Sequence, residues 1–534
     1  MRTAMINRLR QRLQGISRRS CVGAMLMASL LLTWVFALRS GQDTNWDQRN
    51  YHLAVPFLLL QGHFWENVAP AGIQTYLNPL ILVPQYLLIQ HLPPRLATLV
   101  IATFQASTFL VAGLACLAVC ADKAGERTMA LLGFALCLAS PMALSEAGTT
   151  YVDLITAVPI LIAYWRLLAR GTGAQARRAC LLAGLLLGVA GGLKLTNLVF
   201  CFGVPGLLLA GTESWRERAG LLTRMAAATL VGFLLIAGWW HLALWERFSN
   251  PVFPFYNNIF HSPDMAAIAL NDPRFLPHSV WDILHYPLYW VTGGSPNPSL
   301  MSPASENDPR DPRFLLALLG IIASGIALLL RPDWRRRALR TPATGLLLAW
   351  LSVYLVWLGT FAIHRYMVAL EIMTGMVLLV LAAQLPGRRL RHGVLIACAV
   401  ASLIDMHVAL WARSPFAGHW RTIAPTLIDL PGKPLVFLQN APTAYVAASL
   451  PAEARFVGLG SEIDLSAGQT TRLTAQVRAL LDPAAGRTPY LLTLAPHTPD
   501  ATMLAGYQLR LAPNCRQLAI GLDRFSLCRL VPAD

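Results

Sequence analysis

Residues 96–120 read LATLVIATFQASTFLVAGLACLAVC, a run of 25 residues without a charged side chain. An α-helix needs about 20 mostly apolar residues to cross the hydrocarbon core of a bilayer, so this run predicts a transmembrane helix. Ten further apolar runs lie at 21–38, 129–144, 151–168, 179–193, 197–210, 221–240, 314–330, 344–361, 366–384 and 393–410. The sequence therefore predicts a polytopic α-helical membrane protein with about eleven transmembrane helices.

The composition agrees with this class. Hydrophobic residues make up 55% of the chain and charged residues 13%, whereas soluble proteins carry about 25% charged residues. The formal net charge of +16 is compatible with a nucleic-acid binder, but the arginines stand in short runs between apolar stretches, which is how membrane topology is encoded. We therefore predict membrane lipids as the surroundings and no nucleic acid as a partner.

The segment 78–92 (NPLILVPQYLLIQHL) is apolar, but Pro84 interrupts it and Pro93-Pro94 follow it. We interpret it as a helix that lies on the membrane without crossing it. The segments 1–20, 121–128, 166–178, 211–224, 331–341 and 385–392 then share one side of the membrane. They hold 23 of the 43 Lys and Arg residues and five acidic residues. Because basic loops stay inside, we expect a bacterial inner membrane protein with a cytoplasmic N-terminus and a periplasmic C-terminus.

Two long loops, 39–95 and 241–313, and the tail 411–534 then face outward, and residues 1–410 form the transmembrane module. Strand-like stretches in the tail are Pro434–Gln439, Arg455–Gly458, Tyr490–Leu494 and Phe525–Leu530, and helical patterns lie at Thr443–Leu450 and Thr471–Leu481. Alternating strands and helices predict a small α/β domain.

Seven of the nine cysteines lie in apolar runs, which leaves Cys515 and Cys528 in the tail. A turn at Gly521-Leu522-Asp523 folds the two back as a hairpin, and the periplasm is oxidising. We predict a disulfide between them.

The stretch Gly41-Gln42-Asp43-Thr44-Asn45-Trp46-Asp47-Gln48-Arg49-Asn50-Tyr51-His52 directly follows the first predicted span. Its two carboxylates stand at the membrane surface, where a lipid-borne substrate presents its head group. A carboxylate there can take a proton from an acceptor hydroxyl. The alternative is a solvated loop in which Asp43 or Asp47 caps a helix.

The motif Trp46-Asp47-x-x-Asn50-Tyr51-His52, with Tyr76-Leu77-Asn78-Pro79 further on, resembles the GT-C superfamily of membrane glycosyltransferases, which use polyprenyl-phosphate sugars. The closer resemblance is to uncharacterised bacterial members related to polyprenyl-phosphate mannosyltransferases. In that superfamily an acidic residue in the first outward loop is catalytic. The resemblance therefore implies a catalytic role for Asp47, and substrate contacts for Asp43, Asn50, Tyr51 and His52. Asp43 is the alternative candidate for the catalytic base.

Three further outward groups fit the same site. Asp153 follows the short loop after Ser145-Glu146, and in the related lipid-A arabinosyltransferases acidic residues of that loop support the active site; a helix cap is the alternative. Lys194 and Asn197 lie between two short spans, where a lysine either binds a lipid phosphate or snorkels to ordinary head groups. His364-Arg365-Tyr366 form an outward turn, and GT-C members carry an Arg-Tyr pair near here.

A guanidinium binds phosphate through two parallel hydrogen bonds, so we expect Arg365 to bind the donor phosphate. A salt bridge to Glu371 is the alternative role for Arg365.

The expected function is transfer of a monosaccharide from a polyprenyl-phosphate donor to an envelope glycan, glycolipid or protein at the periplasmic face, with inversion. We expect no cofactor and no metal, although related oligosaccharyltransferases use one. The alternatives are a lipid-linked glycan transporter or flippase, and an O-antigen-type polymerase or ligase. Transporters place charged residues near the bilayer midplane, whereas the charged residues of this chain stand at the outer ends of the predicted spans. A polymerase or ligase typically depends on arginines in a long outward loop, and the loop 241–313 holds few arginines. Both observations favour the transferase.

Overall fold

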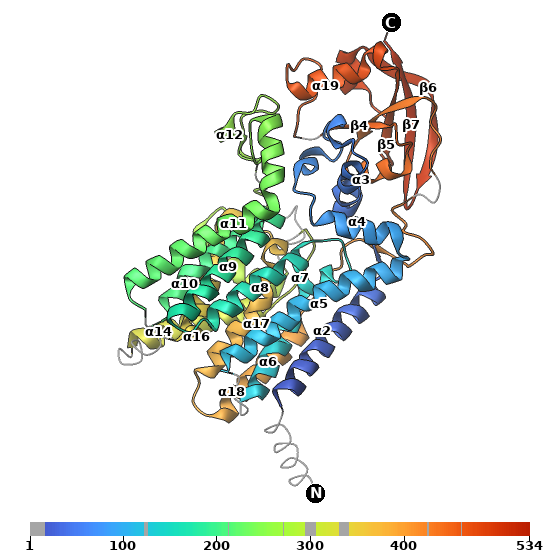
Figure 1. Cartoon of the computed structure of the whole chain (residues 1–534). Coiled ribbons are helices and arrows are strands. Elements are labelled where there is room, and N and C mark those ends of the chain that lie inside the picture. The colour runs from blue at the N-terminus through green and yellow to red at the C-terminus, as the bar shows by residue number, and fades with distance from the viewer. Residues whose placement is uncertain are drawn as a thin grey trace.

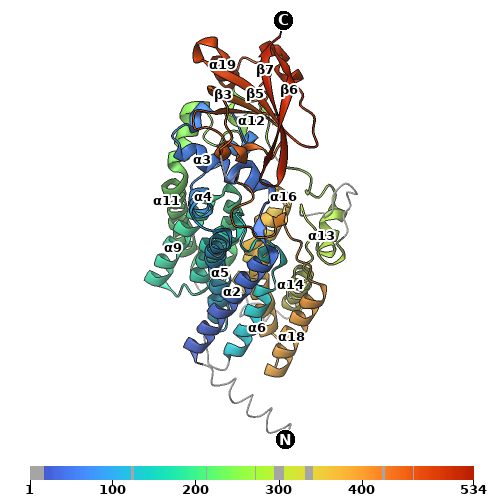
Figure 2. The ribbon, with the colours of Figure 1, turned by 90° about the vertical axis from the view of Figure 1, so that its right-hand side faces the viewer.

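The structure is a computed structural model that describes residues 17–121, 126–211, 213–270, 272–293, 306–330, 341–423, 427–460 and 462–533. A bundle of helices forms one end of the molecule and a β-sheet the other, with the first loop between them (Figures 1 and 2). The first described helix starts at the end of the bundle far from the sheet, and the chain ends in the sheet.

The bundle consists of α2 Arg18–Ser40, α5 Pro94–Val119, α6 Arg127–Leu138, α7 Pro141–Glu146, α8 Asp153–Leu168, α9 Gly173–Leu193, η5 Leu195–Gly203, α10 Val204–Leu209, α11 Trp215–Phe248, α14 Arg313–Leu330, α16 Pro342–Thr360, η6 His364–Met367, α17 Val368–Ala383 and α18 Arg388–Asp405. Every predicted span that lies among the described residues is thus helical over most of its length.

Seven helices in the described part of the chain are long and apolar enough to cross a membrane. They are Arg18–Ser40, Pro94–Val119, Gly173–Leu193, Trp215–Phe248, Arg313–Leu330, Pro342–Thr360 and His364–Ala383. The helices in the other four predicted spans are shorter than these seven or carry more charged residues. Those spans are 129–144, 151–168, 197–210 and 393–410. The run 129–144 breaks where Pro141 starts α7, and the run 197–210 begins as a 3₁₀-helix. The run 393–410 ends its helix early, at Asp405.

Close contact between α9 and α11 illustrates how the bundle packs. Gly184 and Gly188 of α9 form a G-x-x-x-G motif, which lets two membrane helices approach closely. A Cβ at Gly188 would lie 2.0 Å from the carbonyl oxygen of Thr229 in α11, and one at Gly232 would lie 2.2 Å from that of Leu185. The two helices therefore meet backbone to backbone.

The outward loops contain short elements. They are β1 Gln42–Asp43, η1 Gln48–His52, α3 Ala54–Leu60, η2 Phe64–Glu66, η3 Gly72–Tyr76, α4 Leu82–His91, α12 Asn257–Phe260 and α13 Val280–Thr292. The segment expected to lie on the membrane is α4, whose ten residues are too few to cross a bilayer. Figure 1 shows α4 between the bundle and the sheet.

The C-terminal part forms a five-stranded sheet in the order β4-β3-β5-β7-β6. Its elements are β3 Lys433–Gln439, η7 Ala444–Ser449, β4 Arg455–Leu459, α19 Arg472–Leu481, η8 Pro483–Ala485, β5 Arg487–Leu494, η9 Thr502–Tyr507, β6 Leu509–Ile520 and β7 Asp523–Pro532. Strand β3 pairs in parallel with β4 and β5, and β7 pairs antiparallel with β5 and β6. All four expected strands are present, and the two expected helical stretches contain η7 and α19, whereas strand β6 was missed.

The first loop and the sheet share one hydrophobic core. Leu53, Val55 and Phe64 of the loop are buried in the same cluster as Val436 and Leu491 of the sheet. The amide of Val68 donates to the carbonyl of Phe456, and that of Gly458 donates to the carbonyl of Val68, at the edge of β4. The strand β2 Arg413–Ser414 pairs with β1. The first loop is therefore packed against the predicted domain 411–534, and the boundary between module and domain stays a prediction.

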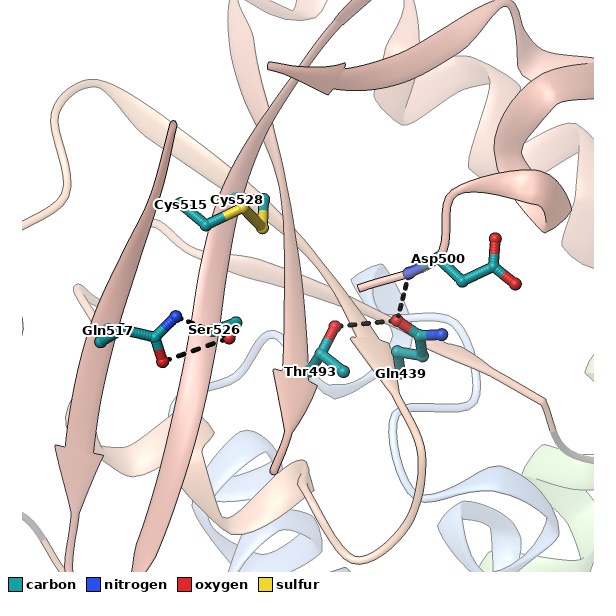
Figure 3. Close-up of a disulfide and its surroundings, with 7 residues drawn as sticks. All are labelled: Gln439, Thr493, Asp500, Cys515, Gln517, Ser526 and Cys528. Atoms are coloured by element: carbon teal, nitrogen blue, oxygen red, sulfur yellow. Dashed lines mark hydrogen bonds between the residues drawn. A yellow bond between two sulfur atoms is a disulfide. The ribbon is translucent and has the colours of Figure 1, made fainter. Parts of the chain in front are cut away.

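Cys515 and Cys528 face each other on β6 and β7 and form a disulfide, the pairing expected from the sequence (Figure 3). Replacing both with alanine should lower the free energy of unfolding of this domain by about 3 kcal/mol. The two cysteines are 13 residues apart, and the chain-entropy model gives about this value for a disulfide that closes a loop of about 15 residues. Thermal unfolding of the double variant measures this. Alkylation of both thiols in the native, unreduced protein would contradict the bond.

Candidate active site

Four helix ends converge at the end of the bundle that faces the sheet. Asp47 follows α2 and β1, Asp153 is the first residue of α8, Lys194 follows the last residue of α9, and Arg365 lies in η6 between α16 and α17. These four residues come from distant parts of the chain. All four side chains are buried or largely buried.

Arg365 links the two carboxylates. Its Nη1 donates to Oδ2 of Asp47 at 2.7 Å and lies 3.9 Å from Oδ2 of Asp153. Lys194 donates to the other oxygen of Asp153. Two cations thus face two carboxylates, which makes this group of four residues, called here the charge cluster, close to neutral.

Aromatic rings surround the cations. The guanidinium of Arg365 lies 4.4 Å from the ring centre of Tyr151 and 5.7 Å from those of Trp411 and Tyr366. The Nζ of Lys194 lies 4.4 Å from the ring centre of Tyr366. Cation–π attraction strengthens when water is excluded, so these rings both hold the cations and keep the charge cluster dry.

Asp47 also accepts a hydrogen bond from the hydroxyl of Tyr51 at 3.2 Å. Burial raises the pKa of Asp47, but the charge and hydrogen bond of Arg365, with a smaller contribution from Lys194, outweigh burial and hold the pKa below its ordinary value. Asp47 is therefore a carboxylate at neutral pH, and it contacts Arg365 directly.

Asp43 and His52 meet at Thr150, beside the charge cluster. The amide and hydroxyl of Thr150 donate to Oδ2 of Asp43 at 2.7 and 2.8 Å, and Asn45 and Gln48 also donate to Asp43. Burial raises the pKa of Asp43, although Arg413 and these hydrogen bonds oppose the rise. Asp43 therefore ties the first loop to the loop before α8, and its contact with substrate stays a prediction.

The imidazole Nδ1 of His52 lies 2.9 Å from the hydroxyl of Thr150. Because that hydroxyl donates to Asp43, Nδ1 is the donor in this contact, which leaves Nε2 as an acceptor. Burial lowers the pKa of His52 to about 4, against the opposing charge of Asp47. His52 is therefore neutral at pH 7 and adds no third cation to the site.

The structure leaves three predicted site residues outside the charge cluster. Asn50 donates to the carbonyl of Ala71 in the first loop, and Asn197 donates to the carbonyl of Ala190 at the end of α9. His364 lies inside the bundle, with its ring 4.4 Å from that of Trp290. These contacts shape the backbone around the site, and the substrate contacts of these three residues stay predictions.

Glu371 has other partners than the one considered from the sequence. Its carboxylate accepts from the amides of Met142 and Ala143 at the start of α7 and lies 3.3 Å from Nε2 of His364. Arg313, 3.9 Å away, pairs mainly with Asp311. The alternative in which Arg365 pairs with Glu371 is therefore wrong, because Arg365 pairs with Asp47.

Glu371→Gln should destabilise the protein and lower activity, because it removes the charge that joins α7, α17 and η6 while preserving side-chain size. Breaking a buried ionic contact costs about 3–5 kcal/mol when the partner charge stays behind. The melting temperature in detergent measures the first effect. An unchanged melting temperature would show that the network does not hold η6.

Four further residues lie near the charge cluster; sequence reasoning placed Tyr151 and Glu146 at the outward loop beside the site without giving them a role, and it missed Trp411 and Glu306. Tyr151 and Trp411 carry the rings next to Arg365, and Glu306 lies 3.7 Å from its Nη2. Glu146 is fully buried and accepts from the amide of Leu154 at 2.9 Å. The positions of Tyr151 and Trp411 at the outward ends of apolar runs were the available signal, since aromatic residues are enriched there.

Among the described residues, no group of three or more His, Cys, Asp or Glu side chains is placed to hold a metal ion. Metal independence stays a prediction.

Comparison with known proteins adds family information. A model of glycosyltransferase family 87 matches residues 76–293. Two crystal structures of ArnT from Cupriavidus metallidurans resemble the fold. The form bound to undecaprenyl phosphate has a TM-score of 0.52 at 17% identity, covering 95% of this chain and 97% of that chain. The apo form has a TM-score of 0.53 at 17% identity, covering 96% and 98%.

A search among curated proteins found no match. The fold likeness extends over nearly the whole chain, from the first span to the sheet, and the family match covers the segment from Tyr76 to Gly293. The chain is thus a multi-pass membrane protein with the fold of the GT-C superfamily of membrane glycosyltransferases.

Proposed function

We propose that this protein transfers a monosaccharide from a polyprenyl-phosphate donor to a cell-envelope acceptor at the periplasmic face of the inner membrane. The observation that carries the proposal is the buried pair of Asp47 and Arg365 beside the pair of Asp153 and Lys194. One carboxylate and two cations are the groups that such a transfer needs. The family match and the fold shared with a protein that binds undecaprenyl phosphate support it.

Arg365 and Lys194 would hold the phosphate of the donor. Arg365 already pairs with Asp47, and Lys194 already pairs with Asp153. An incoming phosphate therefore competes with these two carboxylates for the two cations. Well-placed cations stabilise the negative charge that develops on a departing phosphate, by a few kcal/mol for each contact. The rings of Tyr151, Trp411 and Tyr366 exclude water, which strengthens these electrostatic contacts.

Asp47 would act as the general base. The acceptor oxygen forms a bond to the anomeric carbon, the bond between that carbon and the phosphate oxygen breaks, polyprenyl phosphate leaves, and the acceptor proton passes to Asp47. Attack from the face opposite the phosphate inverts the anomeric carbon. When Arg365 turns toward the phosphate, Asp47 loses its strongest neighbouring cation, its pKa rises, and it becomes a stronger base.

The rival functions place charge elsewhere. A transporter carries its charged residues near the middle of the bilayer, whereas Asp47, Asp153, Lys194 and Arg365 all lie at helix ends on one side of the bundle. This position favours chemistry at the membrane surface.

Product analysis separates the candidates. Membranes from a strain that lacks the protein should accumulate a polyprenyl-phosphate monosaccharide, and the purified protein in vesicles should consume that lipid and release polyprenyl phosphate. A flippase would leave the sugar on the lipid, and a polymerase or ligase would consume a pyrophosphate-linked glycan. Either result would contradict the proposal.

The proposal requires the charge cluster to face the periplasm. A reporter that is active only outside the cytoplasm, fused after Asp534, should be active, because the arginine distribution places the C-terminus outside. The same reporter fused within 385–392, a predicted cytoplasmic loop, is the matched control and should be silent. Activity at the control alone would invert the topology and move the site to the cytoplasm.

A further inference from the structure

Helix α13, in the loop between α11 and α14, has three distinct sides. At 100° per residue, Tyr286 and Trp290 share one side, and both are buried at 2% exposure. Asp282 and His285 share a polar side. A third side carries Val280, Trp281, Leu284 and Leu288, which are 69%, 71%, 61% and 44% exposed. These four residues are called here the apolar stripe.

The buried side fixes α13 to the bundle. The ring of Trp290 stacks on Phe314 of α14 at 5.0 Å and lies 4.4 Å from His364 of η6. The hydroxyl of Tyr286 donates to the carbonyls of Phe275 and Ala362 at 2.7 and 3.2 Å. The orientation of the helix is therefore set, and the apolar stripe points away from these contacts.

The apolar stripe lies on a helix that packs against α14, and α14 exposes apolar side chains of its own. Helix α14 is one of the seven helices long and apolar enough to span the membrane, and it exposes Leu319, Ile322 and Ile326 at 54%, 57% and 52%. Figure 2 shows α13 at the flank of the bundle, next to α14 and toward the end nearest the sheet. An amphipathic helix at the membrane surface buries its apolar side at the boundary of head groups and acyl chains, where Trp is enriched.

We propose that α13 is seated in the outer leaflet of the bilayer through its apolar stripe. The occupant of this surface is membrane phospholipid. Because Tyr286 and Trp290 contact Ala362 and His364, the seated helix also holds the turn that immediately precedes Arg365. This consequence rests on the proposed function: the membrane surface fixes the height at which Arg365 meets the donor phosphate.

Photo-crosslinking tests the lipid contact without using activity. The full-length protein carries the photoreactive amino acid p-benzoylphenylalanine at position 284 and is reconstituted in vesicles of phosphatidylethanolamine and phosphatidylglycerol. After illumination we expect the intact mass to rise by the mass of one phospholipid. Position 285, the neighbouring residue on the polar side, and position 522, an exposed leucine in the turn between β6 and β7, should show no such rise.

Position 322 of α14 is the positive control, because Ile322 is 57% exposed on a helix long and apolar enough to span the membrane. Positions 281 and 288 replace 284 if that variant is not recovered from membranes. Lipid adducts at 322 without adducts at the three stripe positions would overturn the proposal. Equal adducts at 284 and 285, or adducts of 284 with a protein chain, would overturn it too. The mass measurement stands whether or not the protein transfers sugar.

Discussion

Asp47→Asn should abolish sugar transfer and leave the binding of undecaprenyl phosphate intact or tighter. General base catalysis contributes about 10²–10⁴ to a rate, and an amide cannot take the acceptor proton. The substitution also frees Arg365 from the ion pair that it makes at 2.7 Å. With one carboxylate fewer beside it, Arg365 attracts a phosphate more strongly. Loss of transfer combined with retained binding is the signature of a base that competes with the substrate for the same cation.

Transfer rate and affinity for undecaprenyl phosphate are measured on the same preparation in lipid vesicles. Asp523→Asn is the matched control. It removes a carboxylate that also pairs with an arginine, Arg49 at 3.0 Å, but at the contact between the first loop and the sheet. The control should keep normal transfer. An active Asp47→Asn variant would remove Asp47 as the base, and weaker lipid binding in that variant would show that Asp47 and the phosphate do not compete.

Arg365→Ala should have the opposite effect on binding. The substitution leaves Asp47 and Asp153 facing each other in a buried site with Lys194 as the remaining cation of the charge cluster. Removing one partner of a buried charge contact costs about 2–5 kcal/mol, which corresponds to an affinity lowered by about thirtyfold or more. Transfer should fall with it, because the phosphate is neither held nor stabilised as it leaves.

Arg365→Lys should not restore the affinity, since an ammonium cannot make two parallel contacts or lie flat against Tyr151. Arg49→Ala, which removes the arginine at the loop–sheet contact, is the matched control and should bind the lipid normally. Unchanged affinity for undecaprenyl phosphate in Arg365→Ala would return Arg365 to a structural role. Full rescue by lysine would show that charge alone matters at this position.

The local chemistry of the sequence determined where the helices and most strands lie. Hydropathy is the sum of many side chains, so one misread residue does not hide a span such as 96–120 or 221–240. Four strands of the sheet were found for the same reason. Strand β6 was missed because Pro513 and several polar residues interrupt its alternation, and pairing with β7 and a register shift between Leu511 and Cys515 maintain it.

The residues of the site were only partly readable from the sequence. Basic residues in outward turns are unusual, and this local signal pointed to Lys194 and Arg365, whereas the resemblance to the GT-C superfamily was needed to select Asp47 and Asp153. No local signal shows that Arg365 pairs with Asp47, 318 residues away, and passes over Glu371, six residues along the same segment. That choice depends on how α17 and η6 are rotated in the bundle.

The partners of Asp43 were likewise not readable from the sequence. Four residues before Asp47, it has the same side chain and the same apparent exposure in the sequence. In the fold, Thr150 from the loop before α8 and neighbouring amides take up its oxygens, whereas Asp47 is left to Arg365 and Tyr51. Sequence determined that carboxylates stand at the membrane surface. Only the packing of the first loop against α8, η6 and the sheet decided which of them faces the cations, because a side chain's partners are set by elements that are distant in the chain.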